Sequence, residues 1–168
     1  MGQNNQKLEK IMDLIFENPE TILRVREISK QTKIPKTTVH RYLSFLKKSG
    51  VIDKENKLII TNYTKFLKTI SIIKKLFNSG LIDYLEEKLA PSSIIVFGSA
   101  RKGEYVKNSD IDLFVESTKR IDLNFSLFEK RLKHKIQLFI EQDINKLSNE
   151  LFNNIINGIK LSGYVKIK

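Results

Sequence analysis

The spacing of apolar residues over the first fifty positions predicts three short helices. Apolar side chains at i, i+3, i+4 and i+7 from Leu8 indicate an amphipathic helix over about residues 6–17. Residues 24–32 predict a second, shorter helix. The third helix is expected to begin at Pro35, which needs no backbone donor in a first helical turn, and to end at Gly50.

Two short apolar pieces follow, residues 51–53 and 57–60, and they predict a small β-hairpin around Lys54-Glu55-Asn56. Two helices of unequal length joined by a tight turn indicate a helix-turn-helix, so we expect a small domain over residues 1–61. The apolar stripe of the next segment predicts a long helix, which we interpret as a linker over residues 62–80.

The remainder of the chain, residues 81–168, mixes helices with strands. Two apolar runs, Ile94–Phe97 and Ile111–Val115, are rich in β-branched and aromatic residues and predict short buried strands. Around them the pattern predicts helices over 81–90, 123–132 and 144–156 and a third strand over 135–140. The fold class is therefore predicted to be α+β, with helices around the strands of this second domain.

Charge is distributed unevenly between the two halves. The 168 residues carry a net charge of +11, and residues 1–80 hold 16 Lys+Arg against 7 Asp+Glu, which is +9 of that charge. A local basic excess of this kind suits an anionic partner, most often nucleic acid. The alternative is a lysine-rich solubilising surface.

Composition excludes several kinds of chemistry. Without cysteine there is no disulfide, no thiolate nucleophile and no cysteine zinc site, and the two histidines lie far apart in the sequence. Any metal is therefore expected to be hard and oxygen-bound. No apolar run approaches the about eighteen residues of a membrane span, and no secretory core follows Met1–Gln6. We expect a cytoplasmic protein with no membrane partner.

Polar residues interrupt the two predicted strands at fixed places. The first strand ends in Gly98-Ser99, and a strand that stops there and opens a helix offers unpaired N–H groups and a hydroxyl to a phosphate. Asp110 and Asp112 stand two apart, so on a strand both carboxylates share one face. There they are close enough to share Mg²⁺ ions that bridge nucleotide phosphates.

The run from Gly98-Ser99 through Arg101 and Gly103 to Asp110-x-Asp112 resembles the signature of the minimal nucleotidyltransferases of the DNA polymerase β superfamily. Gly158–Gly163 is similar to the Gly-Ile-x-Leu-Tyr ending of that family. The resemblance implies that residues 81–168 fold as a short mixed sheet flanked by helices. The resemblance implies transfer of a nucleoside monophosphate from an NTP, which we expect to be ATP, to a hydroxyl acceptor with Mg²⁺ (or Mn²⁺). It also implies that Asp110 and Asp112 bind the metal and that Gly98, Ser99 and Arg101 contact the phosphates.

The sequence departs from this family at one position. A third carboxylate on a neighbouring strand normally completes the metal site, and by order along the chain that position is Gln137. A glutamine carbonyl is a weaker ligand for a hard dication and cannot accept the proton of a nucleophile. Glu141 is expected about 7 Å beyond it along the strand. Three outcomes stay open: a slow or one-metal transferase, a base supplied by the acceptor or a partner, or a domain that binds nucleotide without turnover.

The third predicted helix carries a polar face, and no acidic residue occurs between Ile28 and Ile52. The order helix, helix, basic helix, hairpin is similar to winged helix-turn-helix DNA-binding domains. The resemblance implies that this helix enters the major groove of DNA, with RNA as the alternative. The expected contact residues are Lys36, Thr37, Thr38, His40, Arg41, Ser44, Lys47 and Lys48. A winged helix that docks on a protein or on its own second copy is the alternative.

Three further questions stay open from the sequence. Phe114 and Phe139 are expected beside the aspartates on one sheet face, where they stack a nucleobase or are covered by a neighbouring domain. The acceptor is a small molecule, a nucleic-acid end or a protein tyrosine, and a homodimer through residues 62–78 is one interpretation of the linker stripe. A transcriptional regulator with a degenerate nucleotide-sensing domain is the runner-up function.

Overall fold

The computed structural model describes residues 3–167. Met1, Gly2 and Lys168, which belong to the predicted ranges 1–61 and 81–168, lie outside the described residues. The chain divides between Ser71 and Ile72 into two compact units. The division falls within helix α4 (Asn62–Ser79), so each unit contains one part of that helix.

The first unit is a helical bundle of α1 (Gln3–Glu17), α2 (Val25–Thr32) and α3 (Lys36–Lys48), all within a few residues of the predicted bounds. Buried apolar side chains from all three helices form its core. Lys33 ends α2 in the left-handed conformation, and the Ser29 hydroxyl donates to the Ile34 carbonyl at 2.7 Å. These two features turn the chain sharply from α2 into α3.

The predicted hairpin after α3 contains a single bridge between Ile52 and Leu58 rather than two paired strands. Its tip is held by the Asp53 carboxylate, which accepts from the backbone N–H groups of Glu55 and Lys57 at 2.8 and 2.9 Å. Because the side chain of Asp53 satisfies these donors, the tip folds as a turn and leaves little of the segment for a strand ladder.

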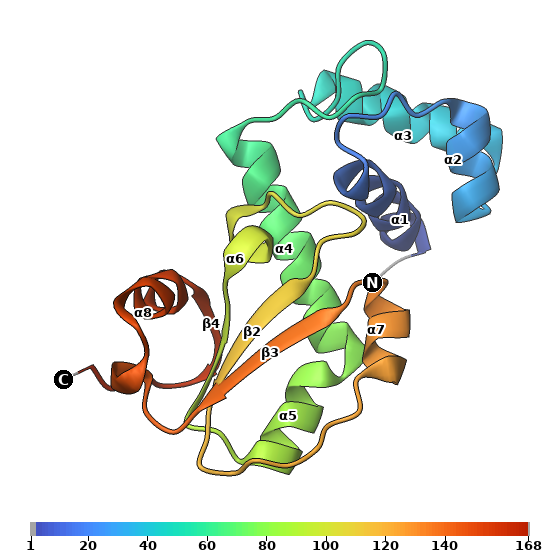
Figure 1. The fold of residues 1–168 in the computed structure, drawn as a ribbon. Helices are drawn as coiled ribbons and strands as arrows, with labels where there is room; N and C mark the ends of the chain where they lie inside the picture. The colour runs from blue at the N-terminus through green and yellow to red at the C-terminus, as the bar shows by residue number, and fades with distance from the viewer. Residues whose placement is uncertain (1–2, 168) are drawn as a thin grey trace. The chain divides into compact units, whose positions relative to one another are not determined.

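The second unit is built on a four-stranded mixed sheet (Figure 1). Its strands lie in the order β3 (Ile136–Glu141), β2 (Ile111–Glu116), β1 (Ser93–Val96), β4 (Ile159–Gly163). Strand β1 is antiparallel to both of its neighbours, whereas β2 and β3 are parallel. The prediction of an α+β fold is confirmed: helix-turn-helix elements come first in the chain, and a short mixed sheet flanked by helices follows them.

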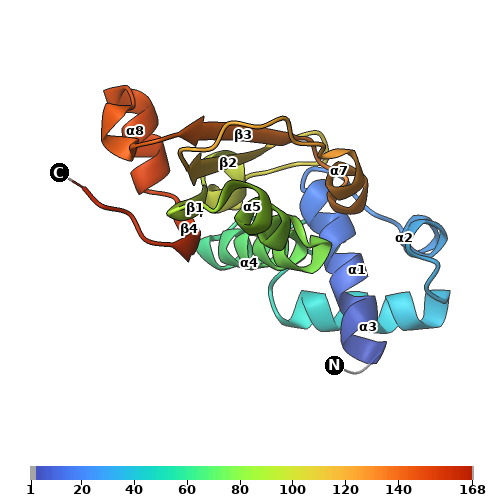
Figure 2. The ribbon, with the colours of Figure 1, turned by 90° about the horizontal axis from the view of Figure 1, so that it is seen from below.

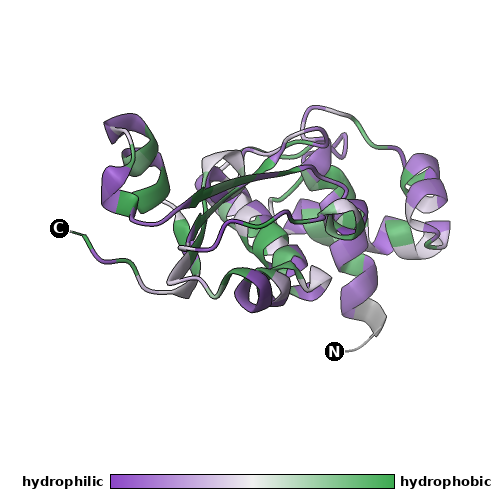
Figure 3. Cartoon of the chain, turned by 60° about the horizontal axis from the view of Figure 1, so that its bottom comes forward, coloured by the Kyte–Doolittle hydropathy of each residue, from purple (hydrophilic) through white to green (hydrophobic). Residues whose placement is uncertain are grey.

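Both faces of this sheet are covered by apolar side chains. Figure 2 shows α5 beside the strands, and Figure 3 shows apolar stretches in the strands and in the helices around them. On one face the second part of α4, α5 (Leu81–Leu89) and α7 (Ser126–Leu132) pack on alternate residues of β1 and β2. On the other face Ile95, Phe97 and Phe114 pack against the short helix η1 (Ile144–Lys146) and α8 (Asn149–Ile156). The chemistry therefore has to lie at an end of the strands rather than on a sheet face.

Two predicted helices are shorter than the apolar pattern indicated. The segment 144–156 breaks at Leu147-Ser148, because the Ser148 hydroxyl accepts from the N–H of Leu151 and begins α8 as an N-cap. Helix α7 begins at Ser126, since the Asn124 side chain accepts from the N–H of that residue at 3.0 Å. Within residues 3–167, no helix combines the length and apolar character needed to cross a bilayer.

Candidate active site and nucleic-acid interface

Gly98 makes the turn between β1 and the short helix α6 (Gly98–Lys102). Its φ of +64° lies in the left-handed region, which side chains rarely adopt. The preceding residue, Phe97, donates its backbone N–H to the carbonyl of Asp112 at 3.1 Å. This bond joins the turn to the beginning of β2, so the Gly98-Ser99 segment and the aspartate are held next to each other.

The carboxylate of Asp112 lies directly against the α-carbon of Gly98. A Cβ placed on Gly98 would stand 2.0 Å from Oδ2 of Asp112, well inside any allowed contact. Only glycine fits there, for a steric reason as well as for its φ angle. Ser99 follows Gly98 in the first turn of α6 and is half-buried.

Asp110 lies one residue before β2, not on the strand as the spacing predicted. It is exposed, whereas Asp112 is half-buried. Burial raises the pKa of the Asp112 carboxyl above its usual range, and the neighbouring charge of Asp110 raises that pKa further. Only Asp112 belongs to the strand, and the charge of Asp110 acts on it from the residue that precedes the strand.

Gln137 stands beside Asp112 in the parallel register of β2 and β3. Its side chain is exposed. Glu141 pairs in the same ladder with Glu116, at the far end of the strands, and forms an ion pair with Arg120 at 2.9 Å. Glu141 therefore does not replace the missing carboxylate. Among residues 3–167, no group of three or more histidine, cysteine or acidic side chains is placed to hold a metal.

His134 supports the approach to β2, a role that the sequence did not reveal. It is buried, with Nδ1 2.8 Å from the carbonyl oxygen of Ser109 and its ring edge-on to Tyr105. A carbonyl only accepts, so this contact requires the proton on Nδ1. The neighbouring N–H of Ile111 donates to the carbonyl of Lys135 at 2.9 Å. Together these bonds fix the backbone on both sides of Asp110.

The two aromatic residues expected beside the aspartates are covered. Phe114 is fully buried, and Phe139 packs at 5.6 Å, between ring centroids, from Phe97. Helix α8 and η1 of the same unit cover them, so the stacking of a base on Phe114 is wrong, as is a covering by a neighbouring domain. The buried Glu116 helps to hold this cover, because it accepts from the Ser92 hydroxyl and from the N–H of Ile144.

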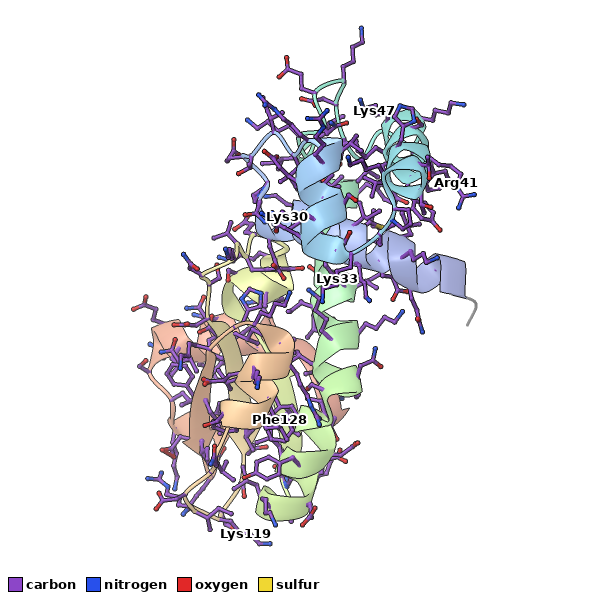
Figure 4. The ribbon with its side chains drawn as sticks, turned by 90° about the vertical axis from the view of Figure 1, so that its right-hand side faces the viewer. Lys30, Lys33, Arg41, Lys47, Lys119 and Phe128 are labelled. Carbon is purple, nitrogen blue, oxygen red and sulfur yellow. The ribbon has the colours of Figure 1, made fainter. Side chains whose placement is uncertain are left out.

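The predicted contact residues of the first unit lie on α3, away from the core side of that helix. Figure 4 shows two of them, Arg41 and Lys47. Val39, Leu43 and Leu46 turn into the core. Lys47 donates to the Lys54 carbonyl at 2.7 Å, which joins the helix to the turn that follows it. Of the eight, Lys36, Thr37, His40, Arg41, Lys47 and Lys48 are exposed and Thr38 and Ser44 half-buried.

Phe45 was missing from that set although its helical position places it one turn after Arg41. It is 53% exposed on the same outer face. A helical projection of the sequence could have found it, since an apolar residue away from the Val39–Leu46 side of the helix has no place in the core.

Comparison with protein-family models agrees with the geometry of both units. Residues 79–157 match a model described as nucleotidyltransferase domain, and this range contains Gly98, Asp110, Asp112 and Gln137. Residues 4–53 match a model described as winged helix-turn-helix DNA-binding. The chain joins a winged helix-turn-helix domain to a nucleotidyltransferase domain. A search of curated proteins and a search of solved structures found no match.

The nucleotidyltransferase domain should lose its ligand when Gly98 becomes alanine. In Gly98→Ala the new methyl group must displace the Asp112 carboxylate, so we expect ATP binding with Mg²⁺ to weaken by about tenfold or more in calorimetry. Gly50→Ala is the matched control. Gly50 has a φ of +68°, and a methyl group added to it would meet nothing within 4 Å, so it shares the backbone strain of about 1–2 kcal/mol without the collision. Equal ligand binding by the two variants would contradict the assigned contact.

The ionised carboxylate of Asp112 should lower the free energy of unfolding of the domain that contains it. Its pKa is raised in the native state, so wild-type stability falls as pH rises from the ordinary aspartate pKa through the raised value. Asp112→Asn removes this titration. We therefore expect the variant to be more stable than wild type at pH 7 in urea unfolding, with the difference vanishing in acid.

Asp122→Asn, in an exposed loop, controls for the loss of one negative charge. A difference between Asp112→Asn and wild type that is independent of pH, or a less stable variant at neutral pH, would show that Asp112 is not strained by burial and by Asp110.

Proposed function

We propose that the chain is a Mg²⁺-dependent enzyme that transfers a nucleoside monophosphate from an NTP to a hydroxyl acceptor. The observation that carries this proposal is the close contact of the Asp112 carboxylate with Gly98, at the turn that begins α6 and within the influence of the Asp110 charge. ATP is the NTP that we propose, and the protein acts in the cytoplasm.

The donor atoms at this place fit a hard cation. Asp110 and Asp112 supply carboxylate oxygens, and Gln137 stands in register to add a neutral amide oxygen. Burial and, after it, the charge of Asp110 raise the pKa of Asp112, and a bound dication would counter both effects. Mg²⁺ or Mn²⁺ bound there supplies positive charge to the phosphates and lowers the pKa of the acceptor hydroxyl.

The remaining steps are assigned to this chain's own groups. The acceptor oxygen forms a bond to the α-phosphorus, and the bond from that phosphorus to the bridging oxygen of pyrophosphate breaks. Backbone N–H groups of the Gly98 turn and the Ser99 hydroxyl donate to the departing phosphates, and Arg101 adds positive charge from the exposed side of α6. Gln137 cannot take the proton of the acceptor, so one of the aspartates or a water molecule must accept it.

The absence of the third carboxylate supports a second candidate. In this interpretation the domain binds nucleotide without turnover, and the chain is a DNA-binding regulator whose second domain senses nucleotides. The observation in its favour is Gln137 in register with Asp112, with Glu141 engaged by Arg120 at the other end of the strands. The two candidates share the nucleotide site and differ in the fate of the α-phosphorus.

The winged helix-turn-helix domain supplies the second partner. We propose duplex DNA for the outer face of α3, since six basic residues and no acidic ones occur between Ile28 and Ile52. RNA is the competing nucleic acid. The winged helix-turn-helix domain would then bring the hydroxyl acceptor to the site. The acceptor is either the end of a nucleic acid or a tyrosine of a protein.

Transfer of label separates enzyme from sensor. With ATP labelled at the α-phosphate, Mg²⁺ or Mn²⁺ and cell extract, we expect labelled product with the wild type and a loss of about a hundredfold or more with Asp110→Ala. Gln137→Asp should raise the rate by about tenfold, because it restores an anionic ligand and a base beside Asp112.

Asp122→Ala is the control for a carboxylate removed from an exposed loop. ATP binding without label transfer by either the wild type or Gln137→Asp would decide for the sensor. Label transfer that Asp110→Ala leaves unchanged would overturn both interpretations of the site.

Binding of duplex DNA should depend steeply on salt. Between about 50 and about 200 mM salt, we expect the affinity to fall as steeply as several phosphate contacts require. The slope of log affinity against log salt concentration should decrease by about one in Arg41→Ala and in Lys48→Ala. Lys119→Ala, exposed in the second unit, should leave the slope unchanged (Figure 4). A flat salt response, measured by fluorescence anisotropy, would rule out groove docking through α3.

A further inference from the structure

Strand β3 is the outermost strand of the sheet and pairs with a neighbour on one side only. In a parallel pair, alternate residues of a strand direct both their N–H and their C=O to the neighbour. The carbonyl of Lys135 accepts from Ile111 of β2, and that of Glu141 accepts from Ser117, each at 2.9 Å. The odd-numbered residues of β3 therefore face β2, and the even-numbered residues direct their backbone groups away from the sheet.

Two of these outward-facing residues, Leu138 and Ile140, are here called the open edge. The N–H of Ile136, which precedes them, is already satisfied, because the Glu129 carboxylate accepts from it at 3.1 Å. Among residues 3–167, no strand or loop bonds to the outward backbone groups of Leu138 and Ile140. Their side chains pack on the core of the second unit. The open edge therefore offers backbone donors and acceptors rather than free apolar surface.

The loop beside the open edge leaves it accessible. A cleft of about 630 Å³ lies there, lined by Arg120, Ile121, Asp122, Leu138 and Ile140. The pairing of β3 with β2 is regular along its whole length. The opposite edge strand, β4, has a register shift against β1, and such irregularities discourage pairing at an edge. Of the two edges of the sheet, β3 is thus the one that can accept another strand.

The charges along β3 fit a second β3 that runs in the opposite direction. Lys133 and Lys135 precede the strand, Glu141 ends it, and Asp143 lies two residues beyond. When identical strands pair antiparallel, the basic start of each lies beside the acidic end of the other, and opposite charges across strands are stabilising. Residues 133–143 are therefore complementary to a second copy of themselves.

The ion pairs within one copy leave these charges accessible. Lys135 pairs with Glu129 at 3.2 Å, and Glu141 pairs with Arg120 at 2.9 Å. The side chain of Lys135 is nevertheless 77% exposed, and that of Glu141 is 35% exposed. Exposed ion pairs contribute little to stability, so they rearrange at small cost when a further charge approaches.

We propose that a second copy of this chain adds its β3 to the open edge in antiparallel orientation, so that two four-stranded sheets join into one. This proposal does not depend on the nucleotide or DNA chemistry proposed above. The free donors and acceptors match when Leu138 of each copy lies opposite Ile140 of the other. The twofold axis of the dimer then passes at Phe139.

This register also determines which charges meet. Lys135 lies between Glu141 and Asp143 of the other copy, on the same face of the joined sheet, because residues two apart on a strand share a face. The backbone bonds come from only two residues of each copy, so the interface is smaller than the about 1,200 Å² of a stable complex. The dimer is therefore weak, with a dissociation constant of about 50 µM.

Amide hydrogen exchange tests the open edge in the unaltered chain. From about 5 to about 500 µM protein, exchange at the N–H groups of Leu138 and Ile140 should slow by about fivefold, because the second copy covers them. Gln137 is the control within the same strand, since its N–H faces β2, and its exchange rate should not change. Exchange at Leu138 and Ile140 that is independent of concentration would overturn the proposal.

Reversal of charge tests the antiparallel pairing. In sedimentation velocity of the full chain, the wild type should pass from monomer to dimer between about 5 and about 500 µM. Lys135→Glu and Glu141→Lys should each weaken the dimer by about tenfold or more, because like charges then meet twice across the twofold axis. An equimolar mixture of the two variants should recover the dimer, since every such contact in the mixed pair is again between opposite charges.

Lys160→Glu is the matched control, because Lys160 is exposed on β4 at the other edge of the sheet, and it should dimerise like the wild type. Far-UV circular dichroism checks that each variant is folded. A wild type that stays monomeric at about 500 µM would overturn the proposal and leave the open edge to a strand of another protein. Folded variants whose mixture stays monomeric would overturn the antiparallel pairing of β3 with itself.

Discussion

The contact between the Asp112 carboxylate and the α-carbon of Gly98 is the constraint on which the second unit depends. It requires a first strand that leads into a glycine with positive φ, and a second strand that carries the carboxylate. The carboxylate lies so close to this glycine that no residue with a Cβ could replace it. The hydrogen bond from Phe97 to the Asp112 carbonyl closes the arrangement. Everything proposed for nucleotide chemistry rests on this meeting of a phosphate-binding turn and an anion.

The surroundings of that contact show how a sheet can carry a polar site without exposing its core. One face is covered by α5 and α7, and the other by η1 and α8, so the polar groups are confined to one end of the strands. His134 and the bond from Ile111 to Lys135 fix the backbone there. The site destabilises the fold only locally, because Asp112 is half-buried and is repelled by the charge of Asp110. The rest of the unit is stabilised by apolar packing.

Local pattern was enough for most elements, because apolar periodicity distinguishes helices from strands. Gln137 was found through the resemblance to the nucleotidyltransferases, and the parallel register of β2 and β3 then places it beside Asp112. Local pattern failed where short polar side chains determine where an element begins or ends. Ser148 and Asn124 shortened two helices, and Asp53 reduced the hairpin to one bridge. The roles of His134 and Glu116 depend on partners more than twenty residues away in sequence, and no spacing rule reveals them.

Strand β4 has a consequence for how the domain can be divided. The family match ends at residue 157, whereas β4 begins at Ile159 and pairs with β1, the strand that leads into Gly98. A fragment that stopped with the match would turn β1 into an edge strand with bare N–H and C=O groups. The residues of β4 are therefore structural, and their removal would weaken the support of β1 and of the Gly98 turn while leaving every polar residue of the site in place.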